Sequence, residues 1–295
     1  MTARLIGVDI GGTRTRVGAF SAGELLARRE LPTRGMKEVD QAIRDVLSQV
    51  GWERPEAIGV GAPAPMDMQA GVILGCPNLP HWRNVKVVEK LSEAFGCPVY
   101  LANDATCAAI GELEFGHRAR DFVYITWSTG IGGGVVAGGR VVWGTTGQAG
   151  EIGHMVIRPD GPLCRCGKRG CLEAVASGTG IARAAEERLG ERLPAKEVVA
   201  RARAGDPGAR RIAEEACRAF GQGLSIVWEL LEPELIVLGG GLTRSWDYLG
   251  PMVMEALGRM ARGEPRVVLT KLGDDVGLYG AAALLDHFPK EWASR

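Results

Sequence analysis

The chain has 295 residues, and 35 Lys and Arg balance 35 Asp and Glu, so that the formal net charge is zero. A neutral chain has no basic excess for a polyanionic partner, which argues against nucleic-acid binding. With 46% hydrophobic and 24% charged residues the composition is that of a globular protein of about two domains, which excludes intrinsic disorder and collagen.

The first hundred residues alternate between short strands and helices. Residues 4–10 and 15–20 predict two strands joined by a glycine-rich tip at 11–14. Residues 38–50 carry apolar side chains at helical spacing. The pattern further predicts strands at 24–30, 57–61 and 98–102, a helix at 85–95 and a helix from 103 to about 114. This alternation with short connections is typical of an α/β unit.

The second half opens in the same way. Strands are predicted at 121–127 and 132–137 around another glycine-rich tip, at 128–134. The later predictions are helices at 178–189, 195–204, 207–231, 246–261 and 277–287, and strands at 234–238 and 265–270. Two halves that each begin with a hairpin around glycines indicate a duplicated architecture, with a domain boundary and hinge near residue 104.

No segment has the character of a membrane span or of a signal peptide. The longest uncharged run, residues 122–139, contains six glycines and three hydroxyl side chains, which suit a turn between strands. The N-terminal apolar stretch contains Asp9 and lacks a small-residue cleavage site. We therefore expect a cytoplasmic protein without a membrane partner.

Three glycine-rich turns follow predicted strands, at 11–13, 128–134 and 239–241. Glycine lets backbone N–H groups approach an anion closely, and successive N–H groups form a phosphate cradle. Any one of these turns is equally well a tight hairpin, but three of them in one chain favour a phosphate ligand. None of them matches a P-loop or a dinucleotide-binding turn.

Asn103 and Asp104 lie where an apolar strand gives way to a helix, at the strand end where α/β proteins bind ligands. One interpretation is helix capping, because a side-chain oxygen here satisfies helix N–H groups. The other is catalysis, in which the Asp104 carboxylate accepts the proton of a hydroxyl that attacks a phosphoryl group.

His154, Cys164, Cys166 and Cys171 form the most specific pattern. One imidazole and three thiolates within 18 residues complete a tetrahedral Zn²⁺ shell, and a shell without an open position is structural. The alternative is a set of buried cysteines beside an unrelated histidine. The glycine-rich segment between these residues is loop-like, and the odd total of seven cysteines favours a metal site over disulfides.

Two carboxylates flank this pattern. Glu151 precedes His154 by three residues, and Glu173 follows Cys171 by two. A metal would hold both carboxylates in place and would leave one nitrogen of the imidazole to donate to a ligand oxygen, which suits a polyhydroxylated substrate. Glu173 could equally be a solvated loop charge.

Six stretches resemble the ROK family of sugar kinases and repressors, and most closely its bacterial glucokinases. They follow the family's order across nearly the whole chain: DIGGTRTRVG (9–18), NDATCAAIGE (103–112), STGIGGGVVAGG (128–139), GQAGEIGHMVI (147–157), CRCGKRGCLEAVASG (164–178) and LGGG (238–241). The cysteine-rich stretch is close to diagnostic for the family, whereas LGGG carries little information alone.

The resemblance implies an α/β protein with the actin-like ATPase (ribonuclease H-like) fold, in which two α/β domains surround a cleft. The small domain would comprise residues 1–104 and the C-terminal helix 281–295. The large domain would comprise residues 105–280 and contain a zinc loop at 154–171. Members of the family usually form homodimers or homotetramers.

The resemblance also implies ATP-dependent phosphorylation of glucose, with Asp104 as the general base for the 6-hydroxyl. The implied sugar ligands are Asn78, Asn103, Asp104, Glu151, His154 and Glu173. ATP would bind, with Mg²⁺ near Asp9, to Asp9, Gly11, Gly12, Thr13, Arg14, Thr129, Gly130, Gly132, Gly133, Gly240 and Gly241. A structural Zn²⁺ would bind His154, Cys164, Cys166 and Cys171.

Three positions depart from the commonest family pattern: Arg14 replaces lysine, Thr106 replaces asparagine and Ser128 replaces glycine. Two alternatives to a glucokinase stay open. One is a kinase for N-acetylmannosamine, N-acetylglucosamine, mannose or fructose. The other is a sugar-responsive regulator without turnover, although the family's repressors carry a helix-turn-helix before the stretch that begins at Asp9, and only eight residues precede it here.

Overall fold

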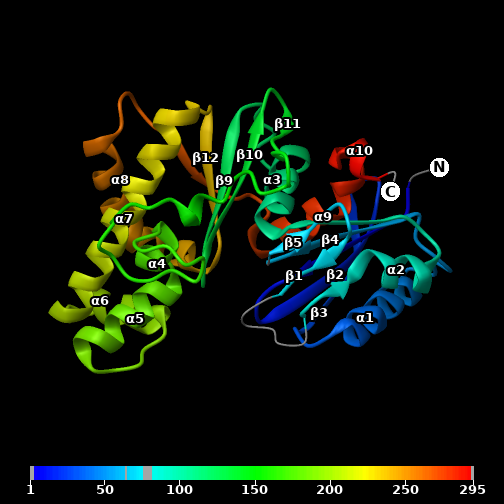
Figure 1. Ribbon diagram of the computed structural model, residues 1–295, viewed down its shortest axis with the longest axis horizontal. Helices are drawn as coiled ribbons and strands as arrows, with labels where there is room; N and C mark the ends of the chain where they lie inside the picture. Colours follow the sequence, from blue (N-terminus) through cyan, green and yellow to red (C-terminus); the bar gives the residue numbers. More distant parts are fainter. Residues whose placement is uncertain (1–2, 64, 76–81, 294–295) are drawn as a thin grey trace. The chain divides into compact units, whose positions relative to one another are not determined.

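The computed structural model describes residues 3–63, 65–75 and 82–293 (Figure 1). The chain forms two compact units that are interleaved in sequence. The first unit comprises Met1–Arg120, Gly134–Ala149 and Lys271–Arg295, and the second comprises Asp121–Gly133 and Gly150–Thr270. Each unit is described by itself below.

The first unit contains a five-stranded sheet in the order β3-β2-β1-β4-β8. Its β1, β2 and β3 are antiparallel, whereas β1, β4 and β8 are parallel. The strands are β1 (Leu5–Ile10), β2 (Arg14–Ser21), β3 (Glu24–Pro32), β4 (Ala57–Ala62) and β8 (Val99–Asn103). Both faces are covered, by α1 (Met36–Gln49) and α2 (Val87–Phe95) on one side and by α3 (Asp104–Glu114) and α9 (Val276–His287) on the other (Figure 1).

The parallel strands have continuous apolar sequences because both of their faces are buried. Every residue of β4 is buried, because helices cover both of its faces. The α1 helix turns Val39, Ile43 and Val46 into the same core, which is the apolar stripe that its spacing predicts.

Glycine allows α9 to approach the sheet and α3 very closely. A Cβ on Gly59 of β4 would lie 1.7 Å from the carbonyl oxygen of Ala281, and one on Gly280 would lie 1.5 Å from that of Cys107 in α3. Both neighbours are backbone atoms, which cannot move aside without shifting a helix. These two glycines therefore determine the spacing of α9 from its neighbours.

We expect Gly280→Ala to destabilise the protein by at least about 2–3 kcal/mol, because the added methyl group overpacks the α3–α9 contact. Gly258→Ala is the matched control, since Gly258 is a helical glycine whose added Cβ would meet no atom within 4 Å. That substitution should be neutral or stabilise by up to about 1 kcal/mol through helix propensity. Urea unfolding of both variants measures the difference, and equal stabilities would contradict the proposed close contact.

The second unit is built on a sheet in the order β11-β10-β9-β12-β13, in which β9, β12 and β13 are parallel. The strands are β9 (Phe122–Trp127), β10 (Ile131–Ala137), β11 (Arg140–Val141), β12 (Leu235–Gly239) and β13 (Val267–Leu269), although β11 and the end of β10 belong to the first unit. Like the first sheet, it joins a hairpin at one edge to parallel strands at the other, which agrees with the predicted duplication.

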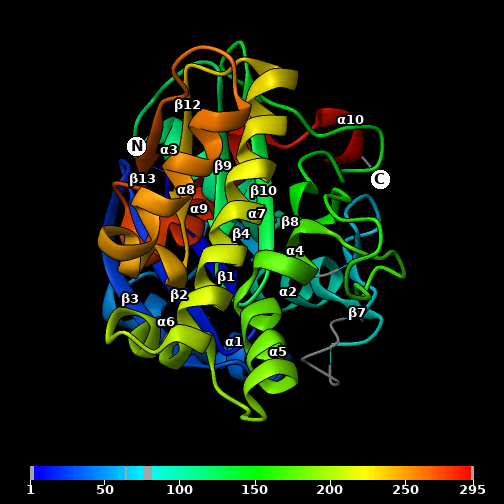
Figure 2. The same ribbon diagram turned by 90° about the vertical axis from the view of Figure 1, so that its left-hand side faces the viewer.

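Helices cover this second sheet, and α7 and α8 lie across β9 and β12 in Figure 2. The helices are α4 (Leu172–Ala176), α5 (Gly178–Leu189), α6 (Ala195–Arg203), α7 (Pro207–Leu231) and α8 (Trp246–Met260). Asp206 caps α7 by accepting from the backbone N–H groups of Gly208 and Ala209, and Pro207 suits the first helical position. Trp127 of β9 stacks on Phe220 of α7, with ring centroids 4.1 Å apart.

The predicted strands and helices are confirmed to within a few residues, and α5 and α7 have the predicted bounds. Several short elements were not predicted: the three-stranded sheet of β5 (Met66–Asp67), β6 (Val72–Ile73) and β7 (Val85–Lys86), together with β11, α4, α10 (Lys290–Ala293) and three 3₁₀ turns. In the described part of the chain, no helix combines the length and the apolar character that a membrane span requires.

Candidate functional site

In the first unit, three parallel strands bring two acidic positions to one edge of the sheet. Asp9 of β1 is the register partner of Gly61 in β4, and the next residue, Ala62, is the partner of Asn103 in β8. Asp9 and Asp104 therefore lie at the carboxyl ends of β1 and β8, the two strands that flank β4, at the edge where open α/β sheets bind ligands.

Capping of α3 uses the side-chain oxygen of Asn103 but not its side-chain NH₂ group. Its Oδ1 accepts from the backbone N–H of Ala105 at 2.8 Å and from that of Thr106 at 3.4 Å, so the capping interpretation is confirmed for this residue. The side-chain NH₂ is a donor that capping leaves unused. Asp104 is the first residue of α3, is half-buried, and accepts from the N–H of Ala105 through Oδ1 at 2.8 Å.

The buried thiol of Cys107 lies near both carboxylates. Burial raises the pKa of Cys107 well above its usual value, and the negative charges of Asp9 and Asp104 raise it further. A Cβ on Gly61 would lie 3.1 Å from the Cys107 sulfur and 3.6 Å from the Cα of Asp104. The glycine at this strand end thus permits the first turn of α3 to approach the edge that carries Asp9.

Asp9 is a buried carboxylate with one close cation. Arg16 of β2 donates to its Oδ2 at 3.0 Å, and the guanidinium also lies 3.5 Å from Glu30 and 3.8 Å from Asp275. Burial raises the pKa of Asp9, and Arg16 opposes that effect only in part. A carboxylate that is costly to ionise in this way is stabilised when a second cation binds beside it.

Hydrogen bonds within the first glycine-rich turn, and one from Thr33, fix its conformation. The Gly11 N–H donates to the Arg14 carbonyl at 2.9 Å, while the Thr33 hydroxyl donates to the Gly11 carbonyl at 2.7 Å. A Cβ on Gly11 would lie 2.7 Å from the Arg14 oxygen, whereas the corresponding position at Gly12 is open space. Arg14 is exposed and forms an ion pair with Glu30 at 2.6 Å.

In the second unit, Glu173 contacts the second glycine-rich turn directly. Its Oε2 accepts from the backbone N–H of Ile131 at 3.0 Å, and a Cβ on Gly130 would lie 2.5 Å from the same oxygen. Gly133 is similarly confined, since its Cβ would lie 2.5 Å from Ile152. The carboxylate therefore occupies a defined place against the turn, and the interpretation of Glu173 as a solvated loop charge is wrong.

The start of α5 also binds this turn. The Gly178 N–H donates to the Ser128 carbonyl at 2.8 Å, and Thr179 donates to the Thr129 carbonyl through its N–H at 3.1 Å and its hydroxyl at 2.9 Å. The position of the turn is thus coupled to α4 and α5. The sequence contains no local signal for these contacts, because their partners lie about 50 residues apart.

The third glycine-rich turn lies beside the second. Gly240 has φ +95°, and its Cβ would lie 2.6 Å from the Trp127 carbonyl oxygen, while that of Gly241 would lie 3.6 Å from the Ser128 hydroxyl. A side chain at position 240 would therefore be both strained and obstructed. Two of the three predicted phosphate turns are brought together in this unit.

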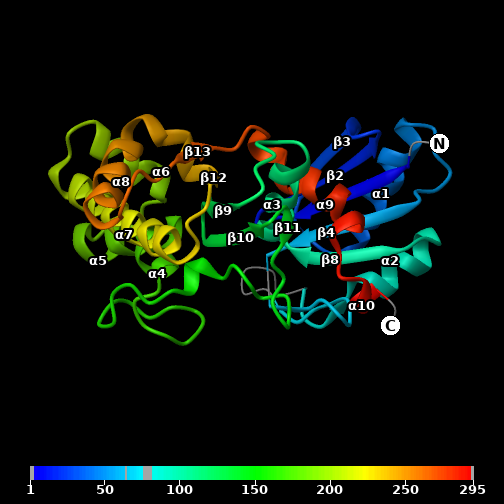
Figure 3. The same ribbon diagram turned by 90° about the horizontal axis from the view of Figure 1, so that it is seen from above.

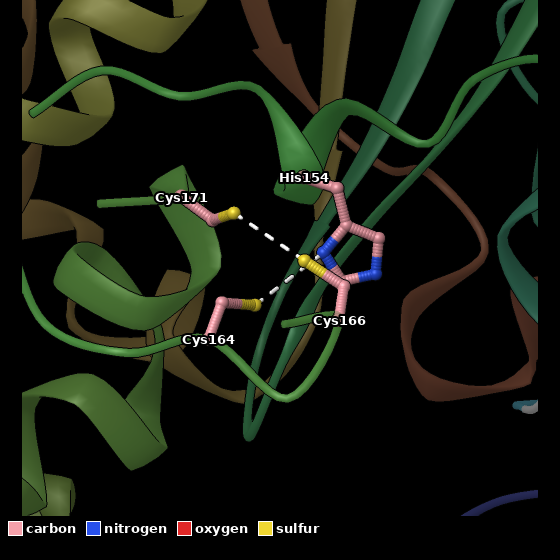
Figure 4. A group of neighbouring side chains, drawn as sticks. All are labelled: His154, Cys164, Cys166 and Cys171. Atoms are coloured by element: carbon pink, nitrogen blue, oxygen red, sulfur yellow. Dashed lines mark hydrogen bonds between the residues drawn. The ribbon is translucent and has the colours of Figure 1, made fainter. Parts of the chain in front are cut away.

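The four predicted metal ligands converge, as Figure 4 shows. Their ligand atoms all lie within 4.8 Å of one another. The His154 Nδ1 is 3.6 Å from the Cys164 sulfur, and the Cys166 sulfur is 3.6 Å from that of Cys171. A tetrahedral zinc site with Zn–S bonds of about 2.3 Å has ligand-to-ligand edges of about 3.7 Å, so the spacing fits this ion.

The chemistry of the donor set supports the same assignment. Burial, followed by the neighbouring thiols of Cys166 and Cys164, raises the pKa of Cys171 to about 12. Burial likewise raises the pKa of Cys164, whereas at Cys166 hydrogen bonds from the Lys168 backbone and from the other two thiols outweigh burial and lower the pKa. Two of the three thiols therefore resist ionisation by themselves, and a divalent cation among the sulfurs stabilises the thiolates. The loop is otherwise fastened by backbone bonds, including those from Ile157 and Arg158 to the Gly170 carbonyl at 2.9 and 3.1 Å.

The two nitrogens of His154 face different partners. Nδ1 faces the sulfurs, and Nε2 lies 3.8 Å from the Glu151 carboxylate. Burial raises the pKa of Glu151, an effect that His154 opposes and the charge of Glu173 reinforces. Glu151, His154 and Glu173 thus form one electrostatically coupled group beside the metal loop.

The predicted site residues are accordingly found in two sets, one in each unit. The first unit holds Asp9, turn 11–14, Asn103 and Asp104, and the second holds the other two turns, the metal ligands, Glu151 and Glu173. Asn78 lies outside the described residues. Sequence reasoning missed Arg16, which binds Asp9, and Thr179, which binds the phosphate turn.

Comparison with known proteins matches residues 5–287 to the family described as ROK. A glucokinase of Thermotoga maritima is 36% identical over 96% of this chain and 97% of its own length, and an N-acetylmannosamine kinase of Shigella flexneri is 34% identical over 95% and 97%. Among solved structures, a ROK hexokinase from Thermus thermophilus superposes with a TM-score of 0.86 at 38% identity, covering 95% of this chain and 96% of that one. A ROK family glucokinase from Streptomyces griseus, in complex with glucose and AMPPNP, gives 0.80 at 31% identity, covering 95% and 98%. The two mixed sheets are those of the expected actin-like ATPase fold, and the chain belongs to the ROK family.

Proposed function

We propose that this protein transfers the γ-phosphoryl group of ATP to the 6-hydroxyl of glucose. The observation that carries the proposal is the edge of the first sheet, where Asp9 and Asp104 lie at the ends of β1 and β8, the two parallel strands on either side of β4. Phosphoryl transfer needs one carboxylate to hold a magnesium ion and another to accept a proton. Full-length similarity to a glucokinase structure that contains glucose and AMPPNP supports the choice of substrates.

Asp104 would act as the general base. The 6-oxygen attacks the γ-phosphorus as the bond from that phosphorus to the ADP oxygen breaks, and the hydroxyl proton passes to the Asp104 carboxylate. The bond from the Ala105 N–H to Oδ1 holds the side chain at the start of α3, so that the base does not have to be ordered at the moment of reaction.

The glycine-rich turns would bind the phosphates of ATP through their backbone N–H groups. Bound near Asp9, Mg²⁺ supplies positive charge to the transferring phosphoryl group. Arg14, being exposed, is available to replace its ion pair with Glu30 by a contact to phosphate. Ser128 keeps its hydroxyl close to Gly241, where the second and third turns meet.

Sugar hydroxyls would bind to Asn103, Asp104, Glu151, His154 and Glu173, and to Asn78. The NH₂ group of Asn103 supplies a donor, and the carboxylates supply acceptors. A structural Zn²⁺ held by His154 Nδ1 and the three cysteines would fix the imidazole, so that Nε2 presents one defined direction to the sugar.

A substrate panel at saturating ATP tests this assignment. We expect kcat/KM to be highest for glucose, and at least about tenfold lower for N-acetylmannosamine, because a pocket shaped for a hydroxyl must desolvate and fit a larger amide. The similarity to an N-acetylmannosamine kinase makes this sugar the second candidate. A higher kcat/KM for it, or for mannose, fructose or N-acetylglucosamine, would replace glucose as the substrate.

The same assay distinguishes a kinase from a non-catalytic regulator. A regulator would bind glucose without releasing ADP, whereas a kinase releases one ADP for each sugar phosphate formed. Absence of ADP release with every sugar of the panel, despite measurable glucose binding, would favour the regulator.

A further inference from the structure

A cavity of about 310 Å³ lies in the second unit, between the metal loop, α5 and α7. Its lining residues come from the metal loop, which contributes Arg158 and Arg169, and from α4, α5 and α7. Figure 3 shows these three helices in the second unit. None of the residues that line it belongs to the predicted sugar or ATP ligands. Its size is at the lower end of the range for small-molecule sites.

Arginine dominates the charges of this cavity. Four guanidinium groups face three carboxylates in its lining: Arg158, Arg169, Arg183 and Arg188 against Asp160, Glu187 and Glu215. Arg188 is neutralised by a bidentate pair with Glu215 at 2.8 Å, and Arg183 lies 3.4 Å from Glu187.

Arg158 and Arg169 are the cations that remain. Within the described part of the chain, neither has a carboxylate at ion-pair distance, and Arg169 makes only a 3.4 Å contact to the Gly161 carbonyl. The charge of Arg158 does act on Glu215, whose pKa it helps to lower, but that carboxylate is already bound by Arg188. Two guanidinium groups that form no ion pair and line the same cavity suit the planar, bidentate binding of a phosphate group.

Part of the cavity lining is apolar. Ile181, Ile212 and Ala216 are already buried, whereas Val175 and Ala184 are half-buried and keep apolar surface open to solvent. An inorganic ion would leave this surface in contact with water. A phosphate ester whose organic part covers it would bind more tightly, because apolar area is then removed from water.

We propose that this cavity binds a small organic phosphate, separately from the sugar and ATP. The phosphate would bind between Arg158 and Arg169, and the organic part would lie on the side chains of α5 and α7. This site goes beyond the kinase activity proposed above, and neither depends on the other.

The structure also connects the cavity to the predicted phosphate turn. The α5 helix that lines the cavity begins with Gly178 and Thr179, which bind the carbonyls of Ser128 and Thr129. The metal loop, which also contributes to the lining, ends at Cys171, directly before the α4 helix whose Glu173 accepts from the Ile131 N–H of the turn. A ligand that contacts α5 and this loop therefore contacts two segments that are connected to the turn, so its binding and that of nucleotide should be coupled reciprocally.

Calorimetric titration of the full-length, zinc-loaded protein with phenyl phosphate and with inorganic phosphate tests the site. Each titration is done alone and with glucose and AMPPNP present in excess, which removes binding at the kinase site. We expect one molecule of phenyl phosphate per chain with a Kd of about 1 mM or below in both conditions, and inorganic phosphate binding at least about tenfold more weakly.

Variants identify the location. Arg158→Ala and Arg169→Ala should each weaken phenyl phosphate binding by at least about tenfold, since each removes a charge-assisted hydrogen bond. Arg218→Ala is the control: it removes an exposed charge of α7 that acts on Glu215 but does not line the cavity, so affinity should change by less than about twofold.

Zinc content and circular dichroism show whether each variant is folded. The proposal is overturned if phenyl phosphate does not bind once glucose and AMPPNP are present, if it binds no more tightly than inorganic phosphate, or if the folded Arg158 and Arg169 variants bind as well as the Arg218 variant. If the substrate panel identifies another sugar, that sugar replaces glucose in these titrations, so the test of the cavity holds whichever sugar the protein phosphorylates.

Discussion

Replacement of Asp104 by asparagine should lower kcat by about 10²–10⁴-fold while glucose binding changes little. The amide has nearly the same shape and can still accept from the Ala105 N–H through its oxygen, but it cannot accept the proton of the 6-hydroxyl. Steady-state kinetics with a coupled ADP assay, together with calorimetric titration of glucose, separates turnover from binding.

Asn103→Asp is a suitable control for this experiment, because aspartate at this position keeps the oxygen that caps α3. It removes the NH₂ donor and adds a negative charge beside Asp104, so we expect an increase in KM for the sugar with a smaller loss of kcat than in D104N, which removes the proton acceptor itself. If D104N retained kcat within about threefold of the wild type, Asp104 would not be the base, since a positioned base contributes far more than that.

Replacement of Cys171 by serine should release the metal and disturb both sets of ligands in the second unit. Wild-type protein should contain about one zinc per chain, and the variant should lose it on dialysis, because three remaining ligands do not complete the tetrahedral shell. Loss of a structural metal should cost on the order of 3 kcal/mol, which corresponds to a decrease in Tm of roughly 6–12 °C.

The kinetic consequence follows from the contacts of α4. Cys171 immediately precedes this helix, and Glu173 in its first turn accepts from the Ile131 N–H of the phosphate turn. We therefore expect KM to increase for ATP as well as for the sugar. If the metal instead positioned only the sugar ligands, its loss would change the KM of the sugar and leave the KM of ATP unchanged.

Cys97→Ser is the matched control, since this half-buried cysteine lies outside the metal cluster. It should retain zinc and the wild-type values of KM. Elemental analysis provides the direct measurement, and zinc-free wild-type protein whose activity is unaffected by a chelator would exclude the structural metal.

The metal cluster could be predicted because its four ligands lie within one short loop. Eighteen residues of chain cannot separate an imidazole and three thiols far in space, so their proximity follows from the sequence alone. The same local reasoning predicted α5 and α7, whose apolar residues recur at helical spacing and whose ends carry capping residues.

Each glycine-rich turn could be predicted by itself, but the proximity of two of them could not. Their sequences identify them as tight turns after strands, but the proximity of turn 239–241 to turn 128–134 depends on the parallel pairing of β12 with β9. The short strands β5, β6 and β7 were not predictable for a related reason, because two residues cannot show a period.

The sequence by itself thus determined the longer strands and helices, the metal ligands and the acidic residues at strand ends, because each of these depends mainly on residues nearby in the chain. Tertiary structure alone decided that Thr179 binds the Thr129 carbonyl, that Glu173 accepts from Ile131, and that Arg158 and Arg169 share a cavity with α5 and α7. Such contacts join residues whose separation in sequence leaves no periodic or compositional trace, so only the path of the folded chain brings them together.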